Sequence, residues 1–180
     1  NFYAVLPETS EQISNIIKFA KKNNLQYMAR GGGTLFAMVS STVMKNAMGL
    51  EDGIIIDLFR MKKLQINKDD MTATVGAGVT AFELQKEAYK NGLRANVAEA
   101  GAHVCANLAS TGIATTWGNT YGWASDNYID VELVDEEGNI FHHSEMGIHN
   151  PYSVEHGLIS LQLYPPGVLT EAIIKLHPIF

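Results

Sequence analysis

Apolar residues recur at helical spacing near the N-terminus, directly after a capping signal. Thr9 and Gln12 have the spacing of a capping box, in which two side chains satisfy the free backbone groups of a first helical turn. The apolar residues that follow share one helix face: Ile13, Ile16, Ile17 and Ala20. This pattern predicts a helix over residues 9–23. Strand-like apolar runs at 2–6 and 26–30 flank it, so the chain opens as a β-α-β unit.

The same kind of signal recurs in the middle of the chain. Thr80 and Glu83 form a second capping pair, and Gly92 stands where a glycine commonly follows a helix. Together they predict a helix over residues 80–90. Other patterns predict a buried strand at 53–57, a turn at 58–64, an alternating strand at 72–78, a solvated hairpin turn at 135–139 and a long surface loop at 141–151.

Composition places the chain among ordinary globular proteins. It has 180 residues, 46% of them hydrophobic, which is enough apolar material for one packed core. Its one cysteine, Cys105, cannot form an internal disulfide, which favours a reducing, cytoplasmic location. The sequence contains no apolar run of the length that spans a membrane.

The formal net charge of −6 conceals an asymmetry between the two halves. Residues 1–94 contain 12 basic and 9 acidic side chains, whereas residues 95–180 contain one lysine and 10 acidic side chains. A small, scattered basic excess argues against nucleic-acid binding, which needs a clustered basic surface. Four histidines of the acidic half match no common metal-ligand spacing and are interpreted as surface or structural: His142, His143, His149 and His156.

Three consecutive glycines, Gly31 to Gly33, follow the predicted strand at 26–30. Glycines leave room for backbone N–H groups to converge on an anion such as a pyrophosphate. The segment lacks the Gly-Lys-Ser/Thr of a Walker loop and the spacing of a Rossmann fingerprint. Two interpretations stay open from the residues alone: an unusual phosphate-binding loop, or a mobile turn.

Several short motifs occur in an order that is more specific than any one of them. They are Arg30-Gly-Gly-Gly-Thr34, the strand ending at Asp57 followed by Arg60-Met61, Thr74-Val-Gly-Ala-Gly-Val79, Asn91-Gly-Leu93, Ile113-Ala-Thr115, Tyr121-Gly122, Asp126, Val131-Glu-Leu-Val134 with Glu137-Gly138, Gly167-Val-Leu-Thr-Glu-Ala172 and His177-Pro178. This ordered set resembles the FAD-binding, PCMH-type domain of the vanillyl-alcohol oxidase / p-cresol methylhydroxylase flavoproteins. The resemblance implies an α+β fold, not a Rossmann fold, in which residues 1–180 form two subdomains around FAD.

The resemblance also implies a set of cofactor-binding positions in two loops and nearby segments. These positions are Arg30, Gly31, Gly32, Gly33, Thr34, Leu35, Gly101, Ser110, Thr111, Ala114, Thr115, Gly118, Gly122 and Val168. The sequence departs from the family pattern at two places. Ser110-Thr111 occupies the position of a family glycine pair, and Pro165-Pro166 removes two backbone donors near Val168.

The mode of flavin attachment is also implied by the resemblance. Covalent members carry a histidine directly after the glycines, where this chain has Thr34, so noncovalent FAD is expected. Other members link flavin to a cysteine ahead of the second loop, and Cys105 lies one residue from that register. A buried core cysteine is the alternative interpretation.

Two aromatic and two acidic residues have both a functional and a structural interpretation. Trp117 and Tyr121 could shield a flavin ring or pack between turns. Asp126 and Asp130 could assist proton transfer, although isolated carboxylates near a strand are usually caps or solvated groups.

The activity implied by the resemblance is oxidation of a small alcohol or 2-hydroxy acid, with hydride transfer to flavin N5 and onward electron transfer to a separate acceptor. The chain ends at Phe180, where the substrate-binding (cap) domain of these flavoproteins begins. The isolated chain is therefore expected to bind FAD without efficient turnover. The competing hypothesis is a noncatalytic module that retains the fold, has weak or lost FAD binding and serves assembly of a larger protein.

Overall fold

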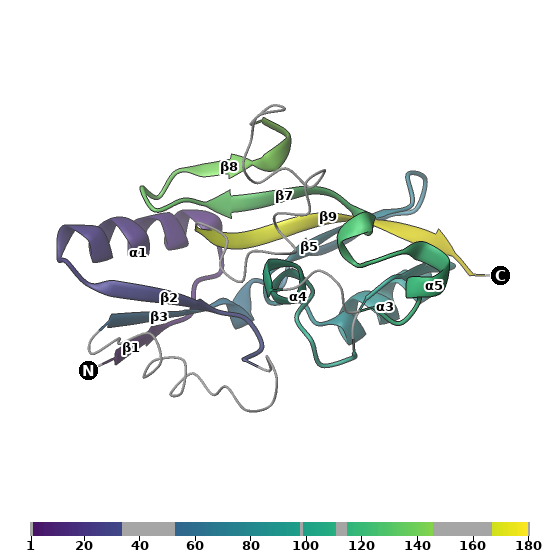
Figure 1. The fold of residues 1–180 in the computed structure, drawn as a ribbon, viewed down its shortest axis with the longest axis horizontal. Coiled ribbons are helices and arrows are strands. Elements are labelled where there is room, and N and C mark those ends of the chain that lie inside the picture. The colour runs from purple at the N-terminus through teal and green to yellow at the C-terminus, as the bar shows by residue number, and fades with distance from the viewer. Residues whose placement is uncertain (1, 34–52, 98, 111–114, 146–166, 180) are drawn as a thin grey trace.

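Two β-sheets and the helices packed on them make up the structure (Figure 1). It is a computed structural model that describes residues 2–33, 53–97, 99–110, 115–145 and 167–179. One hydrophobic cluster runs through both sheets, with buried side chains from α1, from the small sheet and from the large sheet.

The small sheet is parallel and has the order β1-β3-β2, formed by Phe2–Val5, Gly53–Asp57 and Gln26–Arg30. Helix α1 (Ser10–Lys22) packs on it through the fully buried Ile13 and Ile17. The predicted β-α-β unit is confirmed, with β3 inserted between its two strands.

The capping box predicted at the start of α1 is only half present. Thr9 caps the helix by accepting a hydrogen bond from the Gln12 backbone N–H at 3.3 Å. The Gln12 side chain reaches one residue further back and accepts from the Glu8 N–H at 2.7 Å. The helix therefore begins where the sequence predicts, with a second backbone donor satisfied one position earlier than in a standard box.

The large sheet has the order β4-β5-β9-β7-β8, and β6 pairs with β9 outside this path. Its strands are β4 (Leu64–Asn67), β5 (Thr72–Gly76), β6 (Leu93–Ala95), β7 (Tyr128–Val134), β8 (Ile140–His142) and β9 (Val168–Pro178). Every pairing in it is antiparallel. Strand β9, the last of the described strands, pairs with β5, β6 and β7 and runs through the centre of the molecule (Figure 1).

Three further helices lie between strands of the large sheet along the chain. They are α3 (Ala81–Lys90), between β5 and β6, and α4 (Val104–Ser110) and α5 (Gly118–Tyr121), between β6 and β7. Short 3-10 turns occur at Leu58–Arg60, Ser125–Asn127 and His143–Glu145. At α3 the predicted capping box is complete, because Thr80 and Glu83 each bond the other's backbone N–H. Gly92 follows the helix with a φ of +72°. Among the described residues, no helix is long and apolar enough to cross a membrane.

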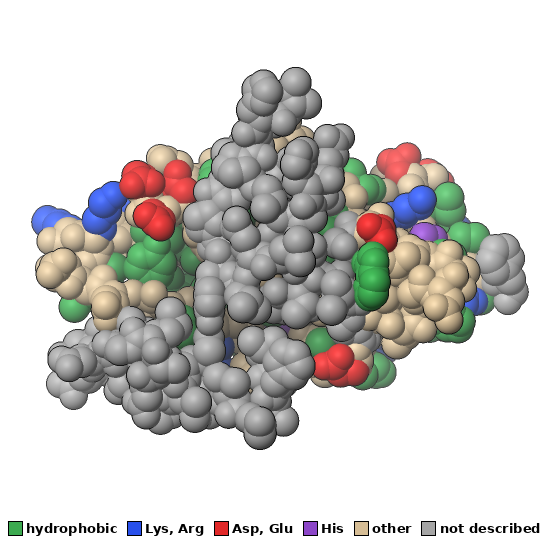
Figure 2. Space-filling view, viewed as in Figure 1, with side chains coloured by type: hydrophobic (Ala, Val, Ile, Leu, Met, Phe, Trp, Pro, Cys, Tyr) green, Lys and Arg blue, Asp and Glu red, His purple; other side chains and the backbone are tan. Residues whose placement is uncertain are grey.

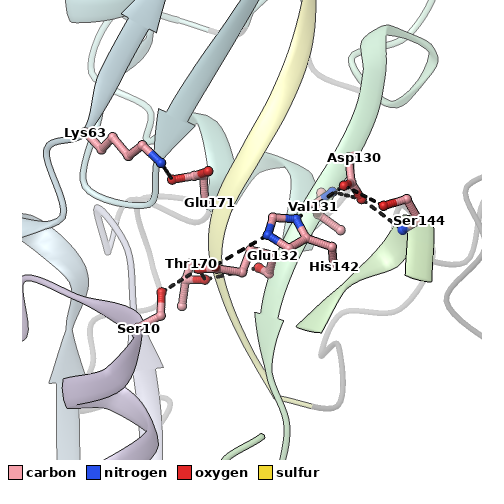
Figure 3. Close-up of polar contacts among 9 residues, drawn as sticks. All are labelled: Ser10, Lys63, Asp130, Val131, Glu132, His142, Ser144, Thr170 and Glu171. Atoms are coloured by element: carbon pink, nitrogen blue, oxygen red, sulfur yellow. Dashed lines mark hydrogen bonds and ion pairs between the residues drawn. The ribbon is translucent and has the colours of Figure 1, made fainter. Parts of the chain in front are cut away.

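Polar contacts attach α1 to the large sheet. The Ser10 hydroxyl donates to Glu132 at 2.5 Å, and the Thr170 hydroxyl donates to the same carboxylate oxygen at 2.6 Å (Figure 3). Glu132 lies directly opposite Glu171 across β7 and β9, a like-charge pair that would destabilise the sheet if uncompensated. Lys63 binds Glu171 at 2.8 Å, so each carboxylate has its own partners (Figure 3).

Two predictions about local structure are corrected by the fold. The segment 58–64 was predicted as a turn. Its first three residues, Leu58–Arg60, form a 3-10 turn, but its last residue, Leu64, is the first of β4. The surface loop predicted at 141–151 is wrong for its first residues, since Phe141 and His142 belong to β8 and are partly buried. His142 is held there by Asp130 at 3.2 Å. Residues 146–151 of that loop lie outside the described part of the chain.

Replacing Ile56 by alanine tests the core. Ile56 in β3 is fully buried, so Ile56→Ala should lower the free energy of unfolding by about 2–5 kcal/mol, the cost of a cavity in a packed core. Ile129→Ala is the matched control, because Ile129 is 52% exposed in β7 and should lose under about 1 kcal/mol. Urea unfolding of the two variants measures the difference, and equal losses would contradict this description of the core.

Candidate cofactor site

The glycine turn after β2 packs directly against helix α4. A Cβ built on Gly31 would lie 2.5 Å from the Cβ of Ala106, much closer than two carbon atoms approach. Gly33 has a φ of +66°, a left-handed backbone that side chains disfavour. The structure therefore requires glycine at both positions, for a close approach at one and for the backbone turn at the other.

Arg30 is neutralised beside this turn. It lies opposite Asp57 at the ends of β2 and β3, and its Nη1 donates to the Asp57 carboxylate at 2.8 Å. Its guanidinium also lies next to the turn, because a Cβ on Gly33 would be 3.0 Å from the Arg30 Nε. With the arginine charge paired, an anion bound at the turn would depend chiefly on backbone N–H groups.

A second segment, Thr115 to Gly122, is fastened to the residue after β6. Asn96, which is buried, accepts hydrogen bonds from the Thr115 hydroxyl and from the Trp117 backbone N–H at 3.2 Å, and donates to the Gly122 carbonyl at 2.9 Å. The Thr116 N–H adds a bond to the Val97 carbonyl at 2.9 Å. One buried amide thus orients a segment that contains three of the predicted cofactor positions.

The aromatic and acidic candidates of this region have structural contacts. Tyr121 stacks on His177, with ring centroids 3.7 Å apart. His177 is held by Asn127, whose Oδ1 lies 2.7 Å from its Nε2. Burial and the nearby charges of Lys175 and Arg94 lower the pKa of His177, so the ring is neutral at pH 7.

The carboxylates of Asp126 and Asp130 both serve local structure. Asp126 accepts from the Trp123 backbone N–H at 2.7 Å, and it fills the space where a Cβ on Gly122 would lie. Asp130 accepts from the Ser144 backbone N–H and hydroxyl at 3.0 and 2.9 Å (Figure 3). These contacts support the structural interpretation of both residues.

A pocket beside α4 is bounded by the start of α3, the residues after β6 and the middle of β9. Its cavity volume is only about 10 Å³, room for about one water molecule, and His103, Asn96 and Asn107 supply polar groups to its wall. The Nδ1 atom of His103 is buried and has no hydrogen-bond partner within the described residues. Burial lowers the pKa of His103 and keeps it neutral at pH 7. A water molecule would fit this space and could satisfy the nitrogen.

Cys105 belongs to the core. Its side chain is buried and donates to the Val75 carbonyl, with Sγ 3.4 Å from the oxygen. Burial raises the pKa of the thiol far above its usual range, so the nucleophilic thiolate is disfavoured. The structure therefore supports the core interpretation of this cysteine over a covalent flavin link.

Some of the positions expected to bind cofactor are brought together, and others are not. Gly31 contacts Ala106 of α4, the helix that ends at Ser110, so the glycine turn lies against the helix that carries the first expected position of the second loop. Gly101 lies in a turn over the start of α3, and Val168 begins β9 opposite Val134. Thr34, Leu35, Thr111, Ala114, Pro165 and Pro166 lie outside the described residues.

Other kinds of site are not found in the part of the chain that the structure describes. No group of three His, Cys, Asp or Glu side chains there could hold a metal ion. On the face drawn in Figure 2, acidic and basic side chains are interspersed wherever described residues are visible, without a basic stripe.

Comparison with known proteins finds a family model that matches most of the chain. A family described as "FAD binding domain" matches residues 3–144. A D-lactate dehydrogenase of Archaeoglobus fulgidus is 32% identical over 186 aligned positions, which cover 99% of this chain and 39% of that protein. The chain therefore spans about two fifths of the length of this relative.

Solved structures share the fold. The 6-hydroxy-D-nicotine oxidase of Arthrobacter nicotinovorans matches with a TM-score of 0.75 at 24% identity, over 97% of this chain and 36% of that one. The BBE-like 1 protein of Physcomitrella patens matches with a TM-score of 0.81 at 21% identity, over 98% of this chain and 36% of its own. The expected two-part, PCMH-type α+β fold is thereby confirmed.

The contact between Gly31 and Ala106 predicts that the effects of substitutions at these two residues on stability are not additive. Gly31→Ala should lower the free energy of unfolding by about 1–3 kcal/mol, because its methyl group overlaps that of Ala106. Ala106→Gly removes the opposing methyl, so the double variant should be more stable than the sum of the two single losses predicts. Gly101→Ala is the control, since nothing lies within 4 Å of the added carbon. Additive losses would contradict the close contact.

The role of Asn96 is tested by its removal. Asn96→Ala removes the acceptor of the Thr115 hydroxyl and the donor to the Gly122 carbonyl, which should cost about 1–3 kcal/mol. Amide hydrogen exchange over residues 115–122 should also accelerate. Asn119→Ala in α5 is the matched control, because Asn119 is exposed. Unchanged exchange in Asn96→Ala would show that the amide does not order this segment.

Proposed function

This chain belongs to the family of FAD-binding domains, and on that premise we propose that it is the cofactor-binding part of an FAD-dependent oxidoreductase that oxidises a small alcohol or 2-hydroxy acid. The observation that supports the proposal is the contact between the glycine turn at Gly31 and helix α4, which ends at Ser110, the first expected position of the second loop. In this proposal, residues 1–180 form one such domain.

The residues of the turn fit a pyrophosphate. Gly31 to Gly33 present backbone N–H groups without side chains, and Arg30 lies beside them with its charge balanced by Asp57. Backbone donors can satisfy phosphate oxygens without a lysine. The second segment, fixed by Asn96, would orient Thr115, Gly118 and Gly122 toward the same cofactor.

Flavin, when bound, supplies an acceptor for a hydride equivalent at N5. The chain's own part is to bind, orient and desolvate it. Thr34 stands where a covalent member carries histidine, and Cys105 is withdrawn into the core, so attachment is proposed to be noncovalent.

The substrate, the substrate-binding domain and the electron acceptor are properties of the whole protein and are proposed as follows. The relative named D-lactate dehydrogenase supports a 2-hydroxy acid as substrate, and its greater length supports a further substrate-binding domain. Onward electron transfer to a separate acceptor is part of the same proposal. A cytoplasmic location remains a prediction from cysteine usage.

The noncatalytic alternative rests on Ser110 and Thr111 in place of a glycine pair. Side chains at these positions would crowd a cofactor that passes close to the backbone, and binding would be weak or lost. The two functions differ in one measurable property, which is affinity for FAD.

FAD binding is the test. Protein purified from cells, or reconstituted with excess FAD, should show flavin absorbance and be stabilised against heat by about 2.7 kcal/mol at a cofactor concentration of 100 times Kd. Gly32→Val should abolish binding by filling the turn. Ala29→Val adds two of the same three carbons on the exposed part of β2 and should bind normally.

The absence of both flavin absorbance and thermal stabilisation would eliminate the flavoprotein proposal and leave the noncatalytic module. Normal binding by Gly32→Val would instead contradict the assignment of the turn to the pyrophosphate.

A further inference from the structure

Arg94 differs from the other two arginines in having no anionic partner. Arg30 binds Asp57 at 2.8 Å and Arg60 binds Glu8 at 3.5 Å. The side chain of Arg94, on β6, forms no ion pair or hydrogen bond within the described residues, and its Nε is buried without an acceptor. A guanidinium carries five N–H donors, and a buried donor without an acceptor is costly. Such a group is suited to a ligand that brings its own acceptors.

The Trp117 ring occupies one face of this guanidinium. The Arg94 Cζ lies 4.8 Å from the ring centroid, a cation–π contact, and the Trp117 backbone is fixed by Asn96. Stacking uses the flat face of the guanidinium and leaves the N–H groups at its edge, which are the groups that bind a carboxylate through two parallel hydrogen bonds. The arginine is thus held in place without its donors being used.

The surroundings of Arg94 are positively charged. Arg94 lies directly opposite His177 across β6 and β9, and Lys175 is two residues before His177 on the same strand face. Lys175 is exposed and, like Arg94, has no carboxylate partner among the described residues. The charges that act on His177 are those of Lys175 and Arg94, and both disfavour its protonation. This part of an acidic chain therefore attracts anions.

The position of Arg94 connects it to the proposed cofactor site. Trp117 lies between Thr115 and Gly118, two of the positions expected to contact FAD, and Tyr121 of the same segment stacks on His177. An anion at Arg94 would be bound beside this segment. Because the proposed function places FAD along this segment, such an anion would be a small molecule that takes part in the reaction.

We propose that Arg94, stacked on Trp117 and supported by Lys175, binds the carboxylate of a small organic acid that is substrate or product of the flavin reaction. This inference rests on the proposed function and adds to it a site and a ligand chemistry. Hydrogen bonds from the guanidinium edge hold the carboxylate, and the charge of Lys175 strengthens its attraction.

Binding of oxalate, a dicarboxylate that is not an alcohol, tests the site in the full-length, FAD-loaded protein. Flavin absorbance and tryptophan fluorescence are followed during titration, in a Trp123→Phe background that leaves Trp117 as the only tryptophan of residues 1–180, with any tryptophan outside these residues also replaced by phenylalanine. Arg94→Gln should raise the Kd for oxalate about tenfold or more, since a charge-assisted bidentate pair is lost. Arg94→Lys should give an intermediate Kd, because it keeps the charge without the fork. Arg60→Gln, which removes an exposed arginine, should bind as the wild type does.

Equal Kd values for wild type and Arg94→Gln would overturn the proposal, as would a wild-type protein that does not bind oxalate. Lower thermal stability of Arg94→Gln with an unchanged oxalate Kd would also overturn it, and would identify the partner as a carboxylate side chain elsewhere in the protein. If Arg94→Gln does not fold, Arg94→Lys and the wild-type titration decide the result. Trp117 fluorescence needs no flavin, so failure to bind FAD and failure of the Arg94 site give different results.

Discussion

The whole arrangement depends on strand β9, which pairs with three strands that precede it. Its first half lies between β5 and β7, and its last residues pair with β6. These pairings close long loops of chain, so the large sheet gains its central strand only when the C-terminal part arrives. Both proposed sites follow from this strand: α4 packs near it, and Arg94 faces His177 across it. The cofactor site is therefore a product of long-range pairing and not of any one local motif.

Local sequence signals were sufficient to predict the ends of a helix or strand where its own side chains determine those ends. Thr9 and Thr80 each cap a helix at the predicted position, and Gly92 follows the second helix with the left-handed backbone that the sequence suggests. Strand β3 was also predicted with its observed ends, because a short run of β-branched isoleucines between Gly53 and Asp57 favours a buried strand.

Elements whose stability comes from tertiary contacts could not be predicted in this way. Helix α4 is only seven residues long, has no charged residue in its end turns, and is supported by contacts to β5 and β9. Asn96 and Arg94 carry no sequence signal at all, since their importance arises from where β6 places them beside a segment some twenty residues later in the chain. The resemblance to a known family predicts where the cofactor loops lie, but it did not identify residues such as Asn96 that hold the neighbouring segment.

Folding pairs many of the charges whose distribution along the sequence is so uneven. The second half is strongly acidic in sequence, yet its central carboxylates have partners: Glu132 with two hydroxyl groups and Glu171 with Lys63 (Figure 3). In the basic first half, Arg30 is balanced by Asp57 at the glycine turn. The cations left without a carboxylate among the described residues include Arg94, opposite His177 of β9, and Lys175, two residues earlier on that strand. Recognition of a phosphate by backbone amides and of a carboxylate by an arginine would thus occur at separate places, each with chemistry suited to its anion.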